Sequence, residues 1–197
     1  MSTWAVTGAS GFLGTNAGLF LRDRAPAVGF SRRTNALTPF STSIELDLRE
    51  STQLSAQIRA IRPSVILHGA AIAGHETAAN DPKQAHEVNV LATEVLAETA
   101  SDIGARMIYI STDALFSGKH GGYKETDPVK PFSISGETKM EGEVRVRSAL
   151  ANHLIVRTNF FGWSETGTKS ILEFFVNAMR NQHKISGYPD FIVTSIY

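Results

Sequence analysis

The sequence predicts an α/β fold built on a doubly wound parallel sheet. Short runs rich in β-branched residues alternate along the chain with longer segments of helical period. A glycine-rich turn links the first of these runs to the first helical segment. Apolar residues make up 42% of the chain and charged residues 19%, a composition that supports a substantial buried core. Because crossovers between parallel strands are right-handed, this alternation indicates helices on both faces of the sheet.

Six short runs are predicted to be strands, because each is too short for a helix of ordinary length. They are Trp4 to Thr7, Ala27 to Phe30, Ser43 to Leu46, Val65 to His68, Met107 to Ser111 and Leu154 to Arg157. The segments between them place apolar residues three or four positions apart, which is the spacing of one helix face. These faces are Leu13 to Leu21, Leu54 to Ile61, Val88 to Leu96 and, in a tail helix from Lys169 to Asn181, Ile171 to Ala178. The stretch from Ser117 to Pro131 is expected to be a long loop.

Charge and composition exclude several classes of protein. The 197 residues include 19 basic and 19 acidic side chains, so the formal net charge is zero and a basic nucleic-acid-binding surface is not expected. The chain has no cysteine, which removes disulfides, thiolate zinc sites and a catalytic thiol. The six histidines lack the paired spacing of a helical metal site, so we expect no bound metal. Apolar runs are too short to cross a bilayer and the first residues do not resemble an export signal, so we expect a cytoplasmic protein with no membrane segment.

The first strand runs directly into the sequence Thr7-Gly8-Ala9-Ser10-Gly11-Phe12-Leu13-Gly14. Gly8 allows a sharp turn, Gly11 allows backbone to approach a pyrophosphate, and Gly14 allows the following helix to pack closely on the strand. The start of that helix offers free N–H groups and its positive dipole end to phosphates. An ordinary strand-to-helix turn is the alternative, but the flanking elements match those of a Rossmann-type dinucleotide-binding unit.

The residues after the second strand predict which dinucleotide is bound. An acidic residue at that place would hold the ribose hydroxyls of NAD, but the chain reads Ser31-Arg32-Arg33. Two guanidinium groups suit a ribose 2′-phosphate, so NADP is favoured over NAD. The alternative is a pair of solvated surface arginines. Asp47, before Leu48, could accept a hydrogen bond from the adenine amino group or could cap a helix.

Further motifs follow in a fixed order along the chain. They are His68-Gly69-Ala70-Ala71, Val88-Asn89-Val90, the run Tyr109 to Gly118 that contains Ser111-Thr112-Asp113, Tyr123-Lys124-Glu125-Thr126-Asp127, Gly136-Glu137-Thr138-Lys139 and Val156-Arg157-Thr158-Asn159. With the glycine turn, they resemble the extended short-chain dehydrogenases/reductases, most closely the dTDP-4-dehydrorhamnose reductase branch. The matches run from the first strand to about residue 162.

The resemblance implies an NADP-binding domain over residues 1–160 and a substrate-binding part that begins at 161–197. It also implies the residues that surround the cofactor: Gly8, Ser10, Gly11, Phe12 and Leu13 at the pyrophosphate, Ser31, Arg32 and Arg33 at the 2′-phosphate, Asp47 and Leu48 at the adenine, and Ala70 and Ala71 along the channel. Thr112 would hydrogen-bond the substrate carbonyl, and Lys139 would hold the nicotinamide ribose. Thr112 follows a strand at its carboxyl end, where open parallel sheets keep their ligand crevice. Asp113, Arg157 and Asn159 lie at the same edge and are candidate substrate ligands.

The chain departs from this family at the proton donor. The family has a tyrosine four residues before the lysine, because positions i and i+4 share a helix face and the ammonium can lower the pKa of the phenol. Here that position is Ser135, and no other tyrosine precedes a lysine by four residues. A serine hydroxyl is far less acidic than a phenol, whose pKa is about 10. Ser135 is therefore the third candidate catalytic residue and the one that puts the ordinary mechanism in doubt.

Three functions remain open from the sequence. The first is an oxidoreductase that reduces a keto group of a nucleotide-sugar-like substrate with NADPH, the proton coming from water through Asp113 or Tyr123. The second is a cofactor-binding regulatory subunit without chemistry, like the regulatory subunit of methionine adenosyltransferase. The third is an epimerase or dehydratase. Since the chain stops at Tyr197, short of a complete substrate lobe for this family, we expect a truncated product or a surface completed by a homodimer or partner subunit.

Overall fold

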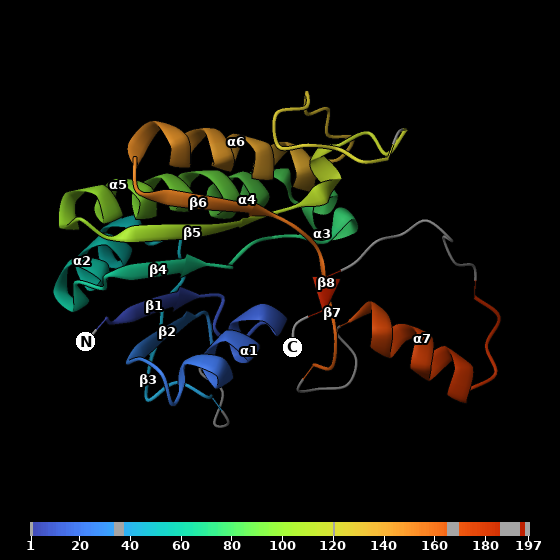
Figure 1. Cartoon of the computed structure of the whole chain (residues 1–197), viewed down its shortest axis with the longest axis horizontal. Coiled ribbons are helices and arrows are strands. Elements are labelled where there is room, and N and C mark those ends of the chain that lie inside the picture. The colour runs from blue at the N-terminus through green and yellow to red at the C-terminus, as the bar shows by residue number, and fades with distance from the viewer. Residues whose placement is uncertain (1, 34–37, 120, 165–169, 186–193, 196–197) are drawn as a thin grey trace.

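The computed structural model describes residues 2–33, 38–119, 121–164, 170–185 and 194–195 (Figure 1). Its centre is a six-stranded parallel sheet in the order β3-β2-β1-β4-β5-β6. The strands are β1 (Trp4–Thr7), β2 (Ala27–Ser31), β3 (Thr42–Glu45), β4 (Val65–His68), β5 (Arg106–Ser111) and β6 (His153–Arg157). From β1 the chain moves outward to β2 and β3, then crosses back to β4 on the other side of β1. The strand order therefore reverses beside β1, which is where ligands bind in open α/β sheets.

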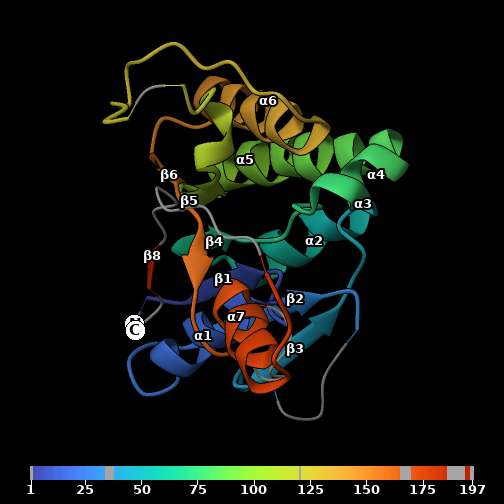
Figure 2. The same ribbon diagram turned by 90° about the vertical axis from the view of Figure 1, so that its right-hand side faces the viewer.

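Helices lie on both faces of the sheet, as Figures 1 and 2 show. The helical segments are α1 (Phe12–Leu21), α2 (Ser51–Ile61), α3 (His75–Asn80), α4 (Pro82–His86), the π-helical turn η1 (Glu87–Leu91), α5 (Ala92–Ile103), the 3₁₀ turn η2 (Asp113–Leu115), α6 (Ile134–Ala149) and α7 (Ile171–Arg180). Helices α2, α5 and α6 pack side by side on one face, and α1 packs on β1 and β2 from the other. Two short strands, β7 (Phe160–Phe161) and β8 (Thr194–Ser195), pair in parallel apart from the main sheet.

The core divides between the two faces of the sheet according to the two-residue period of the strands. Ala5, Ile66 and Met107 face α2, α5 and α6 and are fully buried. Their neighbours Val6 and Leu67 belong to the second cluster, under α1. The strands nearer the β6 edge are less covered on that face, and Leu154 of β6 is 43% exposed. None of the helices in the described part of the chain combines the length and apolarity needed to span a bilayer.

The predicted fold class is confirmed, and the differences from the predicted elements are local. All six predicted strands are present, but the third runs Thr42–Glu45 instead of Ser43–Leu46. The predicted helix over Val88 to Leu96 begins as the π-helical turn η1 and becomes α-helical only at Ala92. The tail helix is shorter than predicted, at Ile171–Arg180, and Lys169 lies outside the described residues. Within the predicted long loop, the described residues contain no helix or strand.

Candidate active site

A crevice of about 610 Å³ opens where β1, β2 and β4 end. Its walls come from five segments of the chain: Gly8, Ser10 and Gly11 after β1, Phe30 to Arg33 at the end of β2, Leu46 to Leu48 after β3, Gly69 to Ile72 after β4, and Val88. All these segments lie at or directly after the end of a strand, except Val88, which lies in η1. The crevice therefore occupies the point of strand-order reversal, at the carboxyl edge of the sheet.

The glycine turn after β1 is shaped by two close approaches. Gly8 has a φ of 72°, and a Cβ atom there would lie 2.9 Å from the backbone nitrogen of Ala70. Gly14 packs so tightly that a Cβ atom would lie 2.2 Å from the carbonyl oxygen of Gly8. Both glycines are thus required by the backbone itself, the first by its left-handed conformation and the second by contact.

Helix α1 begins at this turn without a side-chain cap. Gly11 is its N-cap residue and its amide donates to the carbonyl of Gly8 at 2.9 Å, while no acidic residue lies in the first turn. Phe12 and Leu13 are the first two helical residues, behind the crevice wall. The positive end of the helix dipole is therefore not neutralised by a side-chain cap or by an acidic residue of the first turn, which suits an anionic ligand.

The two arginines after β2 line the crevice on a different segment from the glycine turn. Arg32 and Arg33 line the crevice and are both exposed. The hydroxyl of Ser31 donates to the carbonyl oxygen of Arg33 at 2.8 Å, which holds the turn that carries them. Two exposed cations with permanent charge are thus available to a phosphate group in the crevice.

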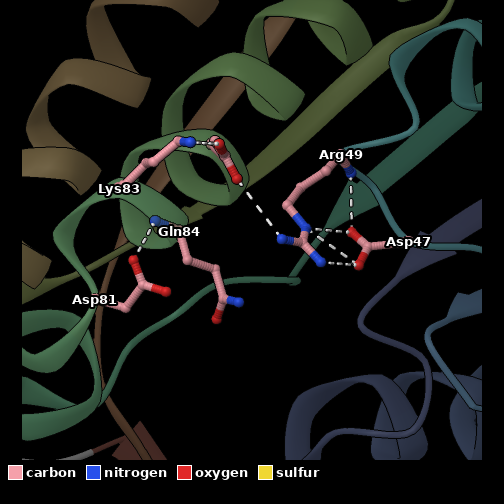
Figure 3. Close-up of polar contacts among 6 residues, drawn as sticks. Asp47, Arg49, Asp81, Lys83 and Gln84 are labelled. Carbon is pink, nitrogen blue, oxygen red and sulfur yellow. Dashed lines mark hydrogen bonds and ion pairs between the residues drawn. The ribbon is translucent and has the colours of Figure 1, made fainter.

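Asp47 and Leu48 form the neighbouring wall, and Asp47 is already engaged. The carboxylate accepts three hydrogen bonds from the guanidinium of Arg49, two from Nε at 3.0 and 3.2 Å and one from Nη2 at 2.7 Å (Figure 3). Hydrogen bonds from Arg49 lower the pKa of Asp47, so the carboxylate is ionised at neutral pH. An ionised carboxylate retains acceptor capacity for an adenine amino group, as predicted for Asp47, and it does not cap α2, whose N-cap residue is Glu50.

A buried chain of hydrogen bonds holds the β4 wall. His68 is fully buried between two hydroxyl groups, with Nδ1 2.6 Å from Oγ1 of Thr7 and Nε2 2.9 Å from Oγ1 of Thr93. Thr93 donates its proton to the carbonyl of Asn89, so Nε2 must be the protonated nitrogen and Nδ1 must accept from Thr7. Thr7 in turn accepts from the backbone N–H of Ala70 at 3.3 Å. The channel residue Ala70 is therefore tied through the imidazole to η1.

Asn89 makes a second connection from η1 to this wall. Its side-chain oxygen accepts from the backbone N–H of Ile72 at 2.8 Å, and its amide nitrogen donates to the carbonyl of Ile72 at 3.1 Å and to Oγ1 of Thr138 at 2.9 Å. The segment after β4 is thus joined to α6. π-Helical turns are rare overall, and those that occur are often found at functional sites.

The candidate catalytic residues lie beside the crevice, on the β5 and α6 side, and are not part of its lining. Thr112 follows β5 and caps η2, its Oγ1 accepting from the N–H of Ala114 at 3.1 Å and donating to Asp113 at 3.3 Å. Asp113 also accepts a hydrogen bond from the side-chain amide of Asn159. The structure therefore brings Thr112, Asp113 and Asn159 together in one cluster.

Lys139 is buried in α6 with its ammonium group over an aromatic ring. It is 5% exposed, and Nζ lies 4.0 Å from the ring centroid of Tyr109. Burial lowers the pKa of Lys139 to about 7, although the negative charge of Glu143 opposes the change. The amine is thus poised to exchange a proton near neutral pH.

Ser135 lies one turn before Lys139 on α6 and is 6% exposed. Its hydroxyl donates to the carbonyl of Ala73 at 3.0 Å, in the segment that follows the crevice wall. Ser135, which the sequence predicts to stand at the proton donor's position, therefore links α6 to the chain after β4.

Arg157 is held in an ion pair. Its Nε and Nη2 donate to the two carboxylate oxygens of Glu143 at 2.9 and 2.8 Å, and Nη1 donates to the carbonyl of Glu125 at 3.2 Å. Burial alone would raise the pKa of Glu143, but hydrogen bonds from Arg157 and the charges of Arg157 and Arg147 hold it below its usual value. The predicted substrate ligand Arg157 is thus placed at the β6 end with its guanidinium engaged.

Sequence reasoning missed several residues of the site. Gly69, Ile72 and Val88 line the crevice, and Glu143 and Asn89 organise its surroundings. Glu143 could have been found from its spacing, because it continues the i, i+4 series of Ser135 and Lys139 on α6. The pairing of Asn89 with Ile72 has no comparable local signal, since the two residues are 17 positions apart.

Comparison with protein families extends over nearly the whole chain. Residues 3–190 match the family model described as RmlD substrate binding domain. The dTDP-4-dehydrorhamnose reductase of Escherichia coli (strain K12) is 32% identical over 135 residues, which is 64% of this chain and 45% of that protein. The methionine adenosyltransferase 2 subunit beta of Bos taurus is 36% identical over 150 residues, 76% of this chain and 43% of that protein. The chain thus spans about half the length of the curated relatives it matches.

Among solved structures, the chain is similar to dTDP-4-dehydrorhamnose reductase from Bacillus anthracis str. Ames in complex with NADP. The TM-score is 0.86 at 25% identity, over 100% of this chain and 67% of that one. The corresponding enzyme from Yersinia enterocolitica gives a TM-score of 0.79 at 28% identity, over 92% of this chain and 61% of that one. With the family model covering the strands, the glycine turn and the crevice, the chain belongs to the RmlD substrate-binding-domain family of extended short-chain dehydrogenases/reductases.

Proposed function

We propose that this chain binds NADP and serves in an oxidoreductase that reduces a keto group of a nucleotide-sugar-like substrate. The observation that carries the proposal is the crevice itself, which is lined by the glycine turn before the uncapped helix α1 and by two exposed arginines after β2. The RmlD-family relatives and the NADP named in the Bacillus anthracis structure support the same assignment.

The crevice residues fit a dinucleotide with a ribose phosphate. Gly8, Ser10 and Gly11 expose backbone along the turn, and the start of α1 at Phe12 and Leu13 directs its dipole at the pyrophosphate position. The adenosine end falls between the Ser31-Arg32-Arg33 turn, with its charges for a 2′-phosphate, and the wall of Asp47 and Leu48. Ala70 and Ala71 continue the channel toward β5 with small side chains that leave room for a ring.

When bound, NADPH supplies the hydride; the chain's residues position the substrate and manage charge. Thr112 is proposed to donate a hydrogen bond to the substrate carbonyl, because its hydroxyl donates, among the described residues, only to Asp113 at 3.3 Å, a long hydrogen bond that is easily exchanged. Asn159 holds the Asp113 carboxylate beside it. Lys139 is proposed to hold the nicotinamide ribose. Burial disfavours its ammonium form, and the negative charge of the bound cofactor would stabilise that form. Arg157 would contact substrate only by giving up part of its pairing with Glu143.

Ser135 makes proton delivery the slow part of such a reaction. Its hydroxyl is bonded to Ala73 and lacks the reach and acidity of a phenol. The proton would then come from water at Asp113, or from Tyr123, which stacks on Phe116 with 4.5 Å between ring centroids. Loss of general acid catalysis typically costs 10²- to 10⁴-fold in rate, and it leaves binding intact.

A regulatory subunit that binds NADP without turnover is the second candidate. The bond from Ser135 to Ala73 favours it, because the proton donor's position has been given to a structural contact. Similarity to the methionine adenosyltransferase 2 subunit beta of Bos taurus supports this alternative.

Binding of NADPH and NADH to the 197-residue chain tests the shared part of both candidates. Calorimetric titration should show NADPH bound more tightly than NADH. Arg32→Gln combined with Arg33→Gln should weaken NADPH by at least about tenfold and change NADH little, since a charge-assisted hydrogen bond contributes about 1.5–3 kcal/mol. Arg59→Gln is a matched control, because Arg59 pairs with Asp102 away from the crevice. Equal affinity of the double variant and the wild type for NADPH would refute the assignment of the arginines.

Turnover separates the two candidates. A reductase should consume NADPH in the presence of a 4-keto nucleotide sugar, slowly in the wild type and faster in Ser135→Tyr. A regulatory subunit should bind NADPH and show no ketone-dependent loss of NADPH absorbance in either form.

A further inference from the structure

A chain of ion pairs joins two walls of the crevice at its adenine end (Figure 3). Arg49 directly follows the lining residue Leu48, and Glu87 directly precedes the lining residue Val88. Nη1 of Arg49 lies 3.6 Å from a carboxylate oxygen of Glu87, and the other carboxylate oxygen of Glu87 lies 3.8 Å from Nζ of Lys83. The chain of ion pairs therefore connects the segment after β3 to α4 and η1 at the crevice, in addition to the packing of α2 on α5 that follows both segments.

Both ends of this connection are held in place. On the β3 side, Asp47 accepts from the Nε and Nη2 atoms of Arg49 and also from its backbone N–H at 3.0 Å, so the guanidinium has one orientation. On the other side, Asp81 caps α4 by accepting from the N–H of Gln84 at 2.9 Å. Glu87 thus projects from a helix whose start is fixed.

We propose that Arg49 is a positioning residue for the adenine end of the bound dinucleotide, acting with Glu87 to set the distance between the Asp47–Leu48 wall and the Val88 wall. This inference rests on the proposed function. Arg49 acts through Asp47 and Glu87 and is itself outside the crevice lining. Since adenine is a flat ring bound between two walls, a fixed separation lowers the ordering cost of binding.

The expected effect is modest, because Arg49 is 42% exposed and Glu87 30%. Solvent-exposed ion pairs contribute little, and the bidentate geometry of Arg49 and Asp47 places that pair among the stronger ones. Removal of the bridge should therefore weaken binding by about three- to fivefold.

Calorimetric titrations of NADPH and of adenosine 2′,5′-bisphosphate, the adenine half of the cofactor, test the proposal. Arg49→Gln and Glu87→Gln should each lose about three- to fivefold in affinity, by the same factor for both ligands. The affinity loss of the double variant should not exceed the larger of the two single-variant losses. Lys83→Gln, which removes only the solvent-side partner of Glu87, and Arg59→Gln, which removes an unrelated pair, should bind within about 1.5-fold of wild type.

Three outcomes would overturn the inference. They are wild-type affinity in Glu87→Gln, additive losses in the double variant, or a loss for NADPH without a matching loss for the bisphosphate. Melting temperatures of the ligand-free variants distinguish a positioning effect from general damage, because an affinity loss accompanied by a shift of more than about 4 °C would indicate a structural role. Failure of the proposed function itself looks different, since wild-type protein would then bind neither ligand.

Discussion

Acidification should destabilise this protein through one buried imidazole. His68 is fully buried, and burial, with the nearby charge of Lys139, lowers its pKa to about 3. Its hydrogen bonds require the neutral form, because Nδ1 accepts from Thr7 while Nε2 donates to Thr93. Protonation of the ring at Nδ1 would place an N–H donor against the hydroxyl group of Thr7, which now donates its proton to Nδ1.

The direction and the magnitude of this pH effect on stability follow from the pKa of His68 in the unfolded chain and in the folded protein. Below pH 6.5 the unfolded chain protonates His68, whereas the folded protein does so only near pH 3, so stability falls as the pH falls through this window. Between pH 7 and pH 5, His68 should account for a loss of about 2 kcal/mol in the free energy of unfolding. Carboxylates titrate mostly at lower pH, and other groups that change charge between pH 7 and pH 5 are shared by the wild type and a His68 variant, so the difference between the two proteins isolates the imidazole.

Urea unfolding at pH 7 and pH 5 measures this loss, and His68→Asn is the non-titrating comparison. The wild type should lose about 2 kcal/mol more than the variant between the two pH values, whatever the stability of the variant at pH 7. Parallel losses in both proteins would show that His68 is protonated in the folded state. The hydrogen-bond directions assigned from Thr93 to Thr7 would then be wrong.

Two other predictions concern backbone contact and buried charge. Gly14→Ala should destabilise the chain by more than about 2 kcal/mol in urea unfolding, because the new Cβ would lie 2.2 Å from the carbonyl oxygen of Gly8. Gly104 has a φ of 70° and open space around it, so Gly104→Ala should cost only about 1 kcal/mol. Equal losses in the two variants would contradict the packing argument. Lys139→Met should raise the melting temperature of the ligand-free protein at pH 7, and the gain should shrink toward pH 10. The reason is that the wild type becomes more stable as the pH rises from the pKa of Lys139 in the folded protein, about 7, to its higher pKa in the unfolded chain. A gain independent of pH would show that the amine is not desolvated.

The parts of the fold that sequence predicted best are those fixed by neighbours in the chain. The alternation of strands and helices follows from periodicity, and the requirement for glycine at position 14 comes from a contact within the turn, with the carbonyl oxygen of Gly8. The placement of Arg32 and Arg33 at the crevice follows in the same way, because both come directly after β2. Strand order then brings these local features to one edge of the sheet.

Features that depend on distant partners could not be predicted from the sequence. Asp47 and Arg157 were identified as ligand candidates by position, but their engagement by Arg49 and Glu143 depends on side-chain geometry. The π-helical turn is another example, since Val88 to Leu96 has ordinary α-helical periodicity. The turn exists where Asn89 reaches the backbone of Ile72, across the crevice wall.

Ser135 shows how binding and chemistry can separate in this fold. The crevice is built from residues between Gly8 and Val88, whereas the candidate catalytic groups lie between Thr112 and Lys139. The two regions meet where Ser135 bonds to Ala73 and Asn89 bonds to both Ile72 and Thr138. A tyrosine at position 135 would forgo the clamp to Ala73, but the Asn89 bonds would still hold the wall. On the predicted assignment of position 135 to the family's proton donor, a serine there removes the donor and leaves the residues of the crevice in place, so loss of catalytic power does not require loss of the proposed cofactor binding.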